Sequence, residues 1–345
     1  MTGNTKMAID LNKAFTSGAD MSSREKEILE DIVSKTDFLP EKVIWRSTYW
    51  GTNQVGAVHY LGIYKNDAAV LKIQGVKPDV SEIFMIEQFA LQNRSKIVRP
   101  PILFHTIPWN EENGYEALIM EHVSGAQVLE SKKLQSRENI KKFLNVYLEY
   151  RNNCLPLKPW LPKPDSVKPE DAFGQLWSTS QKAYPEHPFR KTEDHALGLK
   201  AYQTLFQVYK DVPMEFVHGH ISMYDLVRKG SQVVLFSNLF WKWKFPFYDL
   251  VFGFHWFLFE LEHVEGINPI DIDQQRDLWN KIFFDLPGVR NSEESKKLLK
   301  AALLERAVSG LIIDSFLMDK NKPIVKYLNS PLREQVIQLT KEIAP

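Results

Sequence analysis

The spacing of apolar residues changes character several times along the chain. After Ser22, which stands three residues before Glu25 as in a capping box, apolar positions recur every three to four residues and predict a helix over 23–35. Between residues 43 and 73, short runs rich in Val, Ile, Tyr and Trp are separated by glycines and an Asn-Asp pair, which predicts three strands joined by hairpin turns. Helical spacing then returns, and two more strands follow; the expected segments are 81–93 for the helix and 102–106 and 115–121 for the strands.

Helical periodicity dominates from residue 131 onward. The expected helices are 138–151, 194–210, 248–262, 271–284, 292–318 and 323–342. One strand-like pair, 217–226 and 232–236, interrupts them. The pattern predicts an α+β protein with two lobes: a leader at 1–21, a small sheet-rich N-lobe with an initial helix at 22–125, and a larger helical C-lobe at 126–345.

Composition and charge exclude several classes of protein. The 43 Lys and Arg residues balance the 43 Asp and Glu residues, and a net charge of zero gives no support for a nucleic-acid partner or an anionic membrane surface. No apolar run is long enough to cross a bilayer, and the polar first 22 residues lack the apolar core of a signal peptide, so a cytoplasmic protein is expected. The single cysteine, Cys154, excludes an intramolecular disulfide and a multi-cysteine zinc site.

Short motifs in the N-lobe fall in a fixed order. A Trp-Gly-Thr-Asn run at 50–53 lies at the first hairpin, and Lys72 lies on the third strand. Glu87 follows fifteen residues later on the next helix, and residues 118–125 read as a strand that runs into a hinge. This order resembles the protein-kinase-like fold, in its aminoglycoside phosphotransferase and choline kinase branch, over roughly residues 40–262.

The resemblance implies a nucleotide site, with ATP as the candidate nucleotide. Lys72 would contact the α and β phosphates and would be held by Glu87. The hinge backbone around Glu121 and Val123 would hydrogen-bond an adenine ring. The loop above the phosphates would contain Gly51, Thr52 and Asn53.

The run from His218 to Asp225, His-Gly-His-Ile-Ser-Met-Tyr-Asp, matches the family's catalytic loop with two changes. The family has an aspartate base where this chain has His220, and a metal-binding asparagine where it has Asp225. A Pro-Phe-Tyr-Asp-Leu-Val run that contains Asp249 matches the family segment that follows. Between these anchors the family places its main magnesium ligand, an aspartate; counting forward from Asp225 gives Asn238, and counting back from Asp249 gives Ser237.

These changes predict a degenerate, pseudokinase-like phosphotransferase that binds a nucleotide or small ligand in the cleft between the lobes, with little or no catalysis. Neither candidate for the magnesium position is a carboxylate, which is the ligand that this ion prefers, so the Mg²⁺ site is expected to be weak. Loss of a positioned base alone costs about 10²- to 10⁴-fold in rate.

Two alternatives remain. In the first, the protein is an active ATP-dependent phosphotransferase that acts on a small-molecule hydroxyl, with His220 as the base and Asp225 and Asn238 as an exchanged metal pair. In the second, His218 and His220 share one face of a strand and form a hydrolytic metal site with Asp225.

Aromatic residues crowd the segment 240–248 and are expected to pack mainly in the core. Lys242 and Lys244 alternate there with Trp241 and Trp243, which predicts a half-exposed strand.

Overall fold

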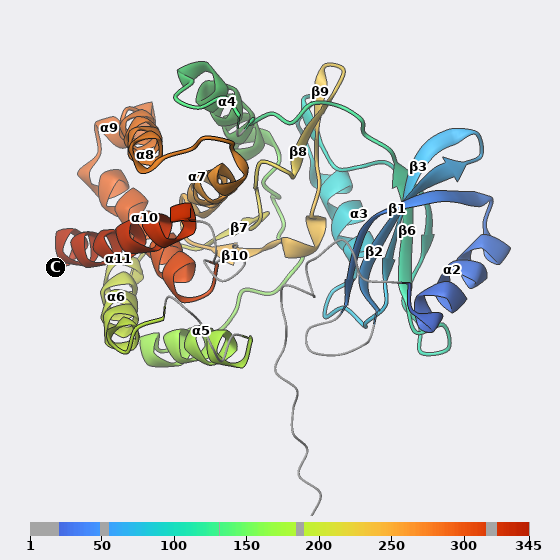
Figure 1. Ribbon diagram of the computed structural model, residues 1–345, viewed down its shortest axis with the longest axis horizontal. Coiled ribbons are helices and arrows are strands. Elements are labelled where there is room, and N and C mark those ends of the chain that lie inside the picture. Colours follow the sequence, from blue (N-terminus) through green and yellow to red (C-terminus); the bar gives the residue numbers. More distant parts are fainter. Residues whose placement is uncertain (1–20, 49–54, 131, 184–189, 315–322, 345) are drawn as a thin grey trace, which may run out of the picture.

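The computed structural model describes residues 21–48, 55–130, 132–183, 190–314 and 323–344. These residues form a sheet-rich N-lobe and a larger helical C-lobe, as Figure 1 shows. The expected two-lobed α+β architecture is therefore confirmed. Within these ranges, no helix is both long enough and apolar enough to span a membrane.

The N-lobe is built on one antiparallel sheet of five strands, in the order β1-β2-β3-β6-β5. The strands are β1 Phe38–Thr48, β2 Val55–Tyr64, β3 Asp67–Gln74, β6 Glu116–Glu121 and β5 Leu103–Ile107. Lys65 and Asn66 both have positive φ in the tight turn between β2 and β3, where Tyr64 pairs with Asp67. Two positive φ angles give the turn type whose twist suits a two-residue hairpin, so the Asn near this position marks the turn correctly.

Two helices complete the N-lobe, α2 Ser23–Lys35 on the outer side and α3 Glu82–Gln92 on the side toward the C-lobe (Figure 1). The Ser22 hydroxyl accepts from the backbone N–H of Glu25, which confirms the predicted cap. The Glu25 carboxylate does not return to the cap; it is buried and accepts from Arg46 Nε at 2.8 Å and from the Tyr60 hydroxyl. This buried pair fastens α2 to the sheet.

The C-lobe consists of helices around small β elements. Its helices are α4 Arg137–Asn153, α5 Pro169–Ala183, α6 Glu193–Tyr209, α7 Tyr248–Glu260, α8 Pro269–Phe284, α9 Pro287–Arg290, α10 Glu293–Ile312 and α11 Pro323–Ile343. Two short 3₁₀ turns are η1 Asn238–Phe240 and η2 Leu261–His263. The core between the helices is rich in large aromatic side chains, among them Phe143, Tyr150, Trp241, Phe257 and Trp279.

Two small sheets lie between the helices and the N-lobe. One pairs β7 Glu215–Val217 with β10 Lys242–Lys244. The other has the order β4-β9-β8, formed by Val98–Arg99, Gln232–Leu235 and Leu226–Lys229. Because β4 follows directly from α3 and pairs in parallel with β9, this second sheet joins the two lobes.

Three expectations need correction. A continuous strand was expected over 217–226. Instead, β7 ends at Val217, residues 218–225 form a loop, and β8 begins at Leu226. Backbone N–H groups of this loop donate to the buried side chains of Asp249 and Asp225 rather than to a neighbouring strand. Helix α5 was not expected, because the proline-rich stretch before it masks the start of the pattern. The helix expected over 292–318 ends as α10 at Ile312.

The Glu25 pair gives a test of the N-lobe. Glu25→Ala removes the buried acceptor of Arg46 and Tyr60, so we expect unfolding by urea to show a loss of about 3–5 kcal/mol. Glu27→Ala, on the same helix turn but exposed and paired only with Arg24 at the surface, is the control and should change stability little. Equal losses in the two variants would show that the buried pair does not fasten α2.

Candidate functional site

The first part of the site is an ion pair between the sheet and α3. Lys72 on β3 donates to the carboxylate of Glu82, and the two side chains are only 14% and 8% exposed. Glu82 is the first residue of α3, and its backbone N–H donates to Glu116 Oε1 on β6 at 3.1 Å. The helix therefore begins where a buried carboxylate of the neighbouring strand accepts its first N–H, and this places Glu82 opposite Lys72.

The prediction that Glu87 pairs with Lys72 is wrong, because Lys72 pairs with Glu82. Glu87 lies five residues after Glu82 on α3, about 140° around the helix axis at about 100° per residue, and its side chain is exposed. The buried face of α3 carries Glu82, Met85, Ile86 and Phe89. Glu82 fits the spacing of that apolar face and Glu87 does not, so the periodicity itself contains the signal that identifies the right carboxylate.

The second part of the site is the hinge after β6. The Glu121 side chain is buried and accepts from Arg99 on β4, from Lys229 on β8 and from the backbone N–H of Ile102. Burial raises the pKa of Glu121, but hydrogen bonds from Arg99 and Lys229 outweigh it, so the pKa lies below its usual value. This carboxylate joins the lobes and is not free to bind a ligand.

The hinge backbone is partly free. His122 donates its N–H to the carbonyl of Ala68 at 3.1 Å, whereas the N–H of Val123 has no acceptor among the described residues. Val123 is half-buried, and an unpaired N–H in such a place is costly unless a ligand or water accepts from it. The phosphate-loop candidates Gly51, Thr52 and Asn53 lie outside the described residues.

The candidate catalytic loop, residues 218–225, is held from beneath by buried side chains. The Tyr150 hydroxyl on α4 accepts from the backbone N–H of His218 at 2.7 Å and donates to Asp249 Oδ2 at 2.8 Å. Asp249 Oδ1 accepts from the N–H of Gly219 at 2.8 Å. Burial raises the pKa of Asp249 to about 6, although both hydrogen bonds lower it.

Gly219 is needed at its position in this loop. Its φ is +77°, and a Cβ there would lie 2.7 Å from the carbonyl oxygen of Phe240. A side chain would therefore meet both an unfavourable backbone conformation and a clash with backbone. The next residue, His220, is partly exposed.

His220 and Asp225 form a dyad at the end of this loop. His220 Nδ1 lies 3.2 Å from Asp225 Oδ2, and its ring stacks on Phe240 with centroids 4.2 Å apart. Asp225 is buried and also accepts from the backbone N–H of Ser222 at 2.8 Å. Burial raises the pKa of Asp225, but the interactions with His220, His218 and Ser222 lower it by more. The pKa therefore lies below its usual value. With Nδ1–H donated to Asp225, the imidazole is left with Nε2 as a proton acceptor.

Asn238 is committed to the core. Its amide donates from Nδ2 to the carbonyl of Leu235 at 2.8 Å, and its Oδ1 accepts from Trp241 Nε1 at 3.2 Å. Both polar ends of the buried side chain are satisfied, so it is not free to form the expected metal pair with Asp225. Ser237, with φ +59°, is the remaining candidate for that position, and its hydroxyl makes no hydrogen bond with the described residues.

The donor set fits magnesium poorly. Asp225 is the one carboxylate of the expected pair, and three donors already bind its Oδ2. In the part of the chain that the structure describes, no three His, Cys, Asp or Glu side chains are grouped to hold a metal. The absence of such a group among the described residues also counts against the hydrolytic metal site, and His218 is fully buried against Trp241 rather than open to a substrate.

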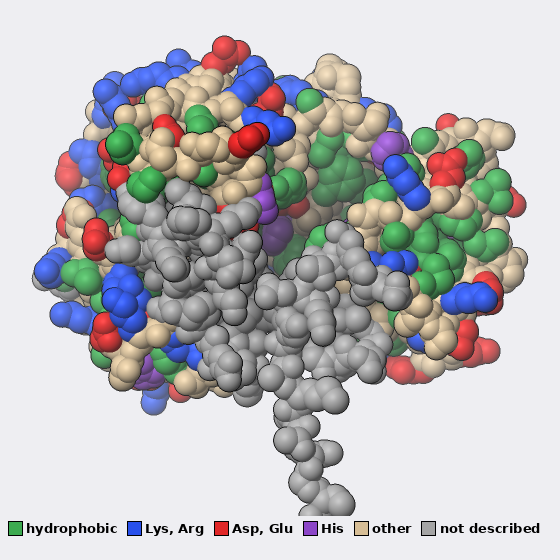
Figure 2. Space-filling model, in the orientation of Figure 1, with side chains coloured by type: hydrophobic (Ala, Val, Ile, Leu, Met, Phe, Trp, Pro, Cys, Tyr) green, Lys and Arg blue, Asp and Glu red, His purple; other side chains and the backbone are tan. Residues whose placement is uncertain are grey.

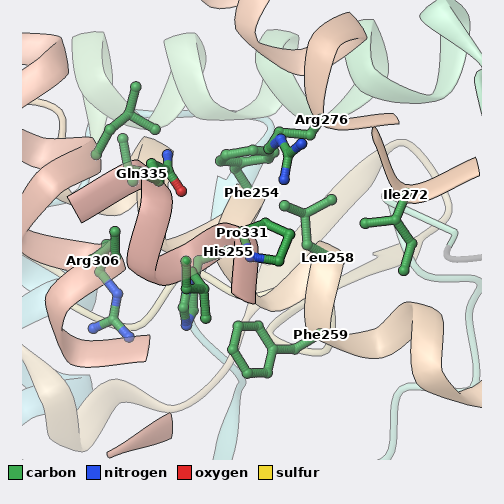
Figure 3. A pocket seen from close by; sticks show the side chains of 13 residues that line it. Phe254, His255, Leu258, Phe259, Ile272, Arg276, Arg306, Pro331 and Gln335 are labelled. Atoms are coloured by element: carbon green, nitrogen blue, oxygen red, sulfur yellow. The ribbon is translucent and has the colours of Figure 1, made fainter. Parts of the chain in front are cut away.

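The surface between the lobes is hollowed (Figure 2), and hydrophobic and histidine side chains are visible inside the hollow. A separate cavity lies inside the C-lobe between α7, α8, α10 and α11, with Pro331 at the centre of its lining (Figure 3). That cavity has a volume of about 30 Å³, which is room for about one water molecule and excludes a nucleotide.

Comparison with known proteins gives matches in structure and none in sequence. No protein-family model matches the chain, and no curated protein matches it. The structure of amicoumacin kinase hAmiN in complex with AMP-PNP, Ca²⁺ and Ami is similar with a TM-score of 0.56 at 13% identity, over 93% of this chain and 95% of that one. A thermostable mutant of aminoglycoside phosphotransferase APH(4)-Ia, in ternary complex with ADP and hygromycin B, gives 0.53 at 11% identity, over 90% and 97%.

Choline kinase from Cryptosporidium parvum Iowa II gives a TM-score of 0.51 at 13% identity, over 92% of this chain and 96% of that one. At such identities the likeness establishes the fold. The chain has the kinase-like fold of aminoglycoside phosphotransferases and choline kinase, as the order of its motifs indicates.

The buried support of the loop can be tested by deleting one hydroxyl. Tyr150→Phe leaves the His218 N–H and one oxygen of Asp249 without a partner in a buried place, so we expect urea unfolding to show a loss of about 1–3 kcal/mol. Tyr147→Phe, a buried position on the same helix whose hydroxyl has no partner among the described residues, should lose much less. If the two variants lose the same amount, the hydroxyl of Tyr150 does not support the loop.

Proposed function

We propose that this protein binds a nucleotide, with ATP as the candidate, in the cleft between its lobes, and that it acts by binding, with phosphoryl transfer weak or lost. The observation that carries the proposal is a division within the site. Two of the groups proposed to hold a nucleotide, Lys72 and the N–H of Val123, are available for a ligand, whereas neither candidate for the main magnesium position is a carboxylate. The solved structures with the same fold include complexes with ADP and with AMP-PNP.

The nucleotide side of the cleft has two prepared contacts. Lys72 is held by Glu82 in a largely buried setting, where a charge-assisted contact to a phosphate is stronger than at the surface. The free N–H of Val123 offers the hinge contact for an adenine ring. Both groups are satisfied by a nucleotide without any change in their protein partners.

The catalytic side of the cleft explains why turnover should be weak. Electrostatic stabilisation of the transferring group is the largest part of phosphoryl transfer in this fold, and it depends on positioned metal ligands. The candidates at the metal position are a serine hydroxyl and an amide that already has partners in the core. A bound small molecule would therefore be held beside His220 rather than converted rapidly.

One observation favours a second candidate function, an active phosphotransferase that acts on a small-molecule hydroxyl. Asp225 orients His220 through the 3.2 Å contact, and an oriented imidazole can accept the proton of a substrate hydroxyl. In this version His220 acts as the base and Asp225 orients it. Asp225 then does not form the exchanged metal pair with Asn238, whose amide is engaged in the core.

The nucleotide contacts predict a pattern of affinities. In titrations of ATP followed by calorimetry, Lys72→Met should weaken binding about 10- to 100-fold, since it removes a charge-assisted phosphate contact. Glu82→Gln should weaken binding less strongly but in the same direction, and Glu87→Gln is the matched control on the exposed face of α3. Wild-type protein that is not stabilised by millimolar ATP would reject the nucleotide site.

The dyad predicts which of the two functions holds. For the binding function, wild-type turnover of ATP with a panel of hydroxylated small molecules should stay at the rate of the protein-free mixture. For the active enzyme, turnover should be robust and Asp225→Asn should lower kcat by about 10²- to 10⁴-fold, because the imidazole loses its orienting acceptor. Robust turnover that is lost in Asp225→Asn would overturn the preferred function.

A further inference from the structure

Three cations surround the ring of Tyr248, at the first position of α7. Lys242 Nζ lies 5.4 Å from the ring centroid and Lys244 Nζ lies 4.2 Å from it. Arg306 on α10 donates from Nη1 to the Tyr248 hydroxyl at 3.5 Å. Tyr248 is buried, and although burial raises its pKa, these three cations lower it below its usual value.

Two of the three cations have their own carboxylates. Lys244 pairs with Glu305 at 2.7 Å, and Arg306 pairs with Asp314. Lys242 has neither an ion-pair partner nor a hydrogen-bond acceptor among the described residues. Among the described residues, Lys242 is therefore the one of these three cations without a carboxylate partner, and its ammonium can still take an anionic acceptor.

The other charged groups near Lys242 act on its pKa in both directions. Burial lowers the pKa of Lys242, and Lys244 and Arg306 lower it further, while Tyr248 and Asp249 act in the opposite direction. Asp249 already accepts from Tyr150 and Gly219 through its two oxygens. In the same cluster, Nε of the buried Arg306 also has no hydrogen-bond partner.

Lys242 lies beside the dyad. Its side chain crosses Gly219, where an added Cβ would lie 2.5 Å from the Lys242 Cε, and Gly219 directly precedes His220. The Arg306 guanidinium lies 5.0 Å from the ring of Phe252, and the same ring packs against His220 at 4.8 Å. An anionic group of a ligand held by Lys242 would therefore lie next to the part of the same ligand that faces His220.

We propose that Lys242, placed by Tyr248 and Arg306, is the centre of an anion-binding subsite that holds a carboxylate or phosphate group of the small molecule in the cleft. The inference rests on the proposed function, because it names the class of ligand that the same cleft takes: an anionic small molecule. Lys242 supplies the ammonium donors, while Lys244 and Arg306 are each paired with a carboxylate and add no net charge around it. The neutral net charge of the chain gives no hint of an ammonium that lacks a counter-ion among the described residues.

The test uses inorganic phosphate, citrate and glucose 6-phosphate as probes, with glucose as the neutral counterpart of the last, all at constant ionic strength. Thermal unfolding of the wild-type protein should shift upward saturably with at least one anionic probe and not with glucose. In Lys242→Met the Kd for that probe should rise at least tenfold, while the response to ATP persists. Lys141→Met, which removes an exposed charge on α4, is the matched control and should bind the probe as the wild type does.

The ligand-free Lys242→Met protein should unfold at the same or a higher temperature than the wild type, because an unneutralised charge leaves a half-buried place. Lys242→Gln serves as a second variant, with a polar side chain and no charge, and should also lose the response to the anion. Wild type without a response to any anionic probe, or Lys242 variants that keep it, would overturn the subsite.

The same experiment shows whether Lys242 binds an anionic group of the nucleotide or of a separate small molecule. If the probe competes with ATP and Lys242→Met loses the ATP response as well, the subsite serves the nucleotide and the inference about the small molecule is wrong. Failure of ATP to stabilise the wild type is a separate outcome, which rejects the nucleotide site and leaves the response to the anionic probes to decide the subsite.

Discussion

The buried carboxylate of Asp249, on the first turn of α7, holds the loop that carries the catalytic candidates. Its two oxygens accept from different parts of the chain, the hydroxyl of Tyr150 and the backbone N–H of Gly219. Because Tyr150 also accepts from the N–H of His218, one carboxylate and one hydroxyl fix consecutive backbone groups. The orientation of His220, the course of Lys242 across Gly219 and the contact of His220 with Asp225 all depend on that fixed backbone.

On this frame the two sides of the cleft differ in chemistry. The N-lobe side keeps a buried ion pair and a free hinge N–H, both suited to a nucleotide. The C-lobe side has His220 where related folds have an aspartate base, and neither Ser237 nor Asn238, directly after β9, is a carboxylate. It also has three cations around Tyr248. This difference is the basis for proposing that the site holds a nucleotide and an anionic small molecule and stabilises a transferring phosphoryl group poorly.

Much of the N-lobe fold was predictable from the sequence alone. The helix after Ser22, the three strands and the position of Lys72 follow from local periodicity and turn residues, which act over a few positions. The partner of Lys72 was predicted wrongly, although the start of α3 was predicted correctly and Ser81 caps it locally; a contact with Glu116, more than thirty residues further along the chain, also holds Glu82 in place. The periodicity of the buried face of α3 would still have favoured Glu82 over Glu87.

Other features depend on contacts that no local pattern contains. The hydrogen bonds of Asn238 with Trp241 and Leu235 favour Ser237 over Asn238 as the more available side chain, whereas spacing along the sequence leaves the two equal. The alternation of lysine and tryptophan predicts a half-exposed strand, and β10 is one. That Lys242 has no counter-ion within the described part of the chain depends on how the lobe packs. Charges that are isolated only in three dimensions cannot be recognised from composition.

The central claim is that the nucleotide side of the cleft works without the metal side. The most direct measurement is a calorimetric titration of the wild-type protein with ATP, done once with excess EDTA and once with excess MgCl₂. The account predicts binding in both conditions with dissociation constants within about threefold of each other, because a weak metal site adds less than about 1 kcal/mol. Binding that is seen only with magnesium, or that tightens by two orders of magnitude with it, would contradict the account.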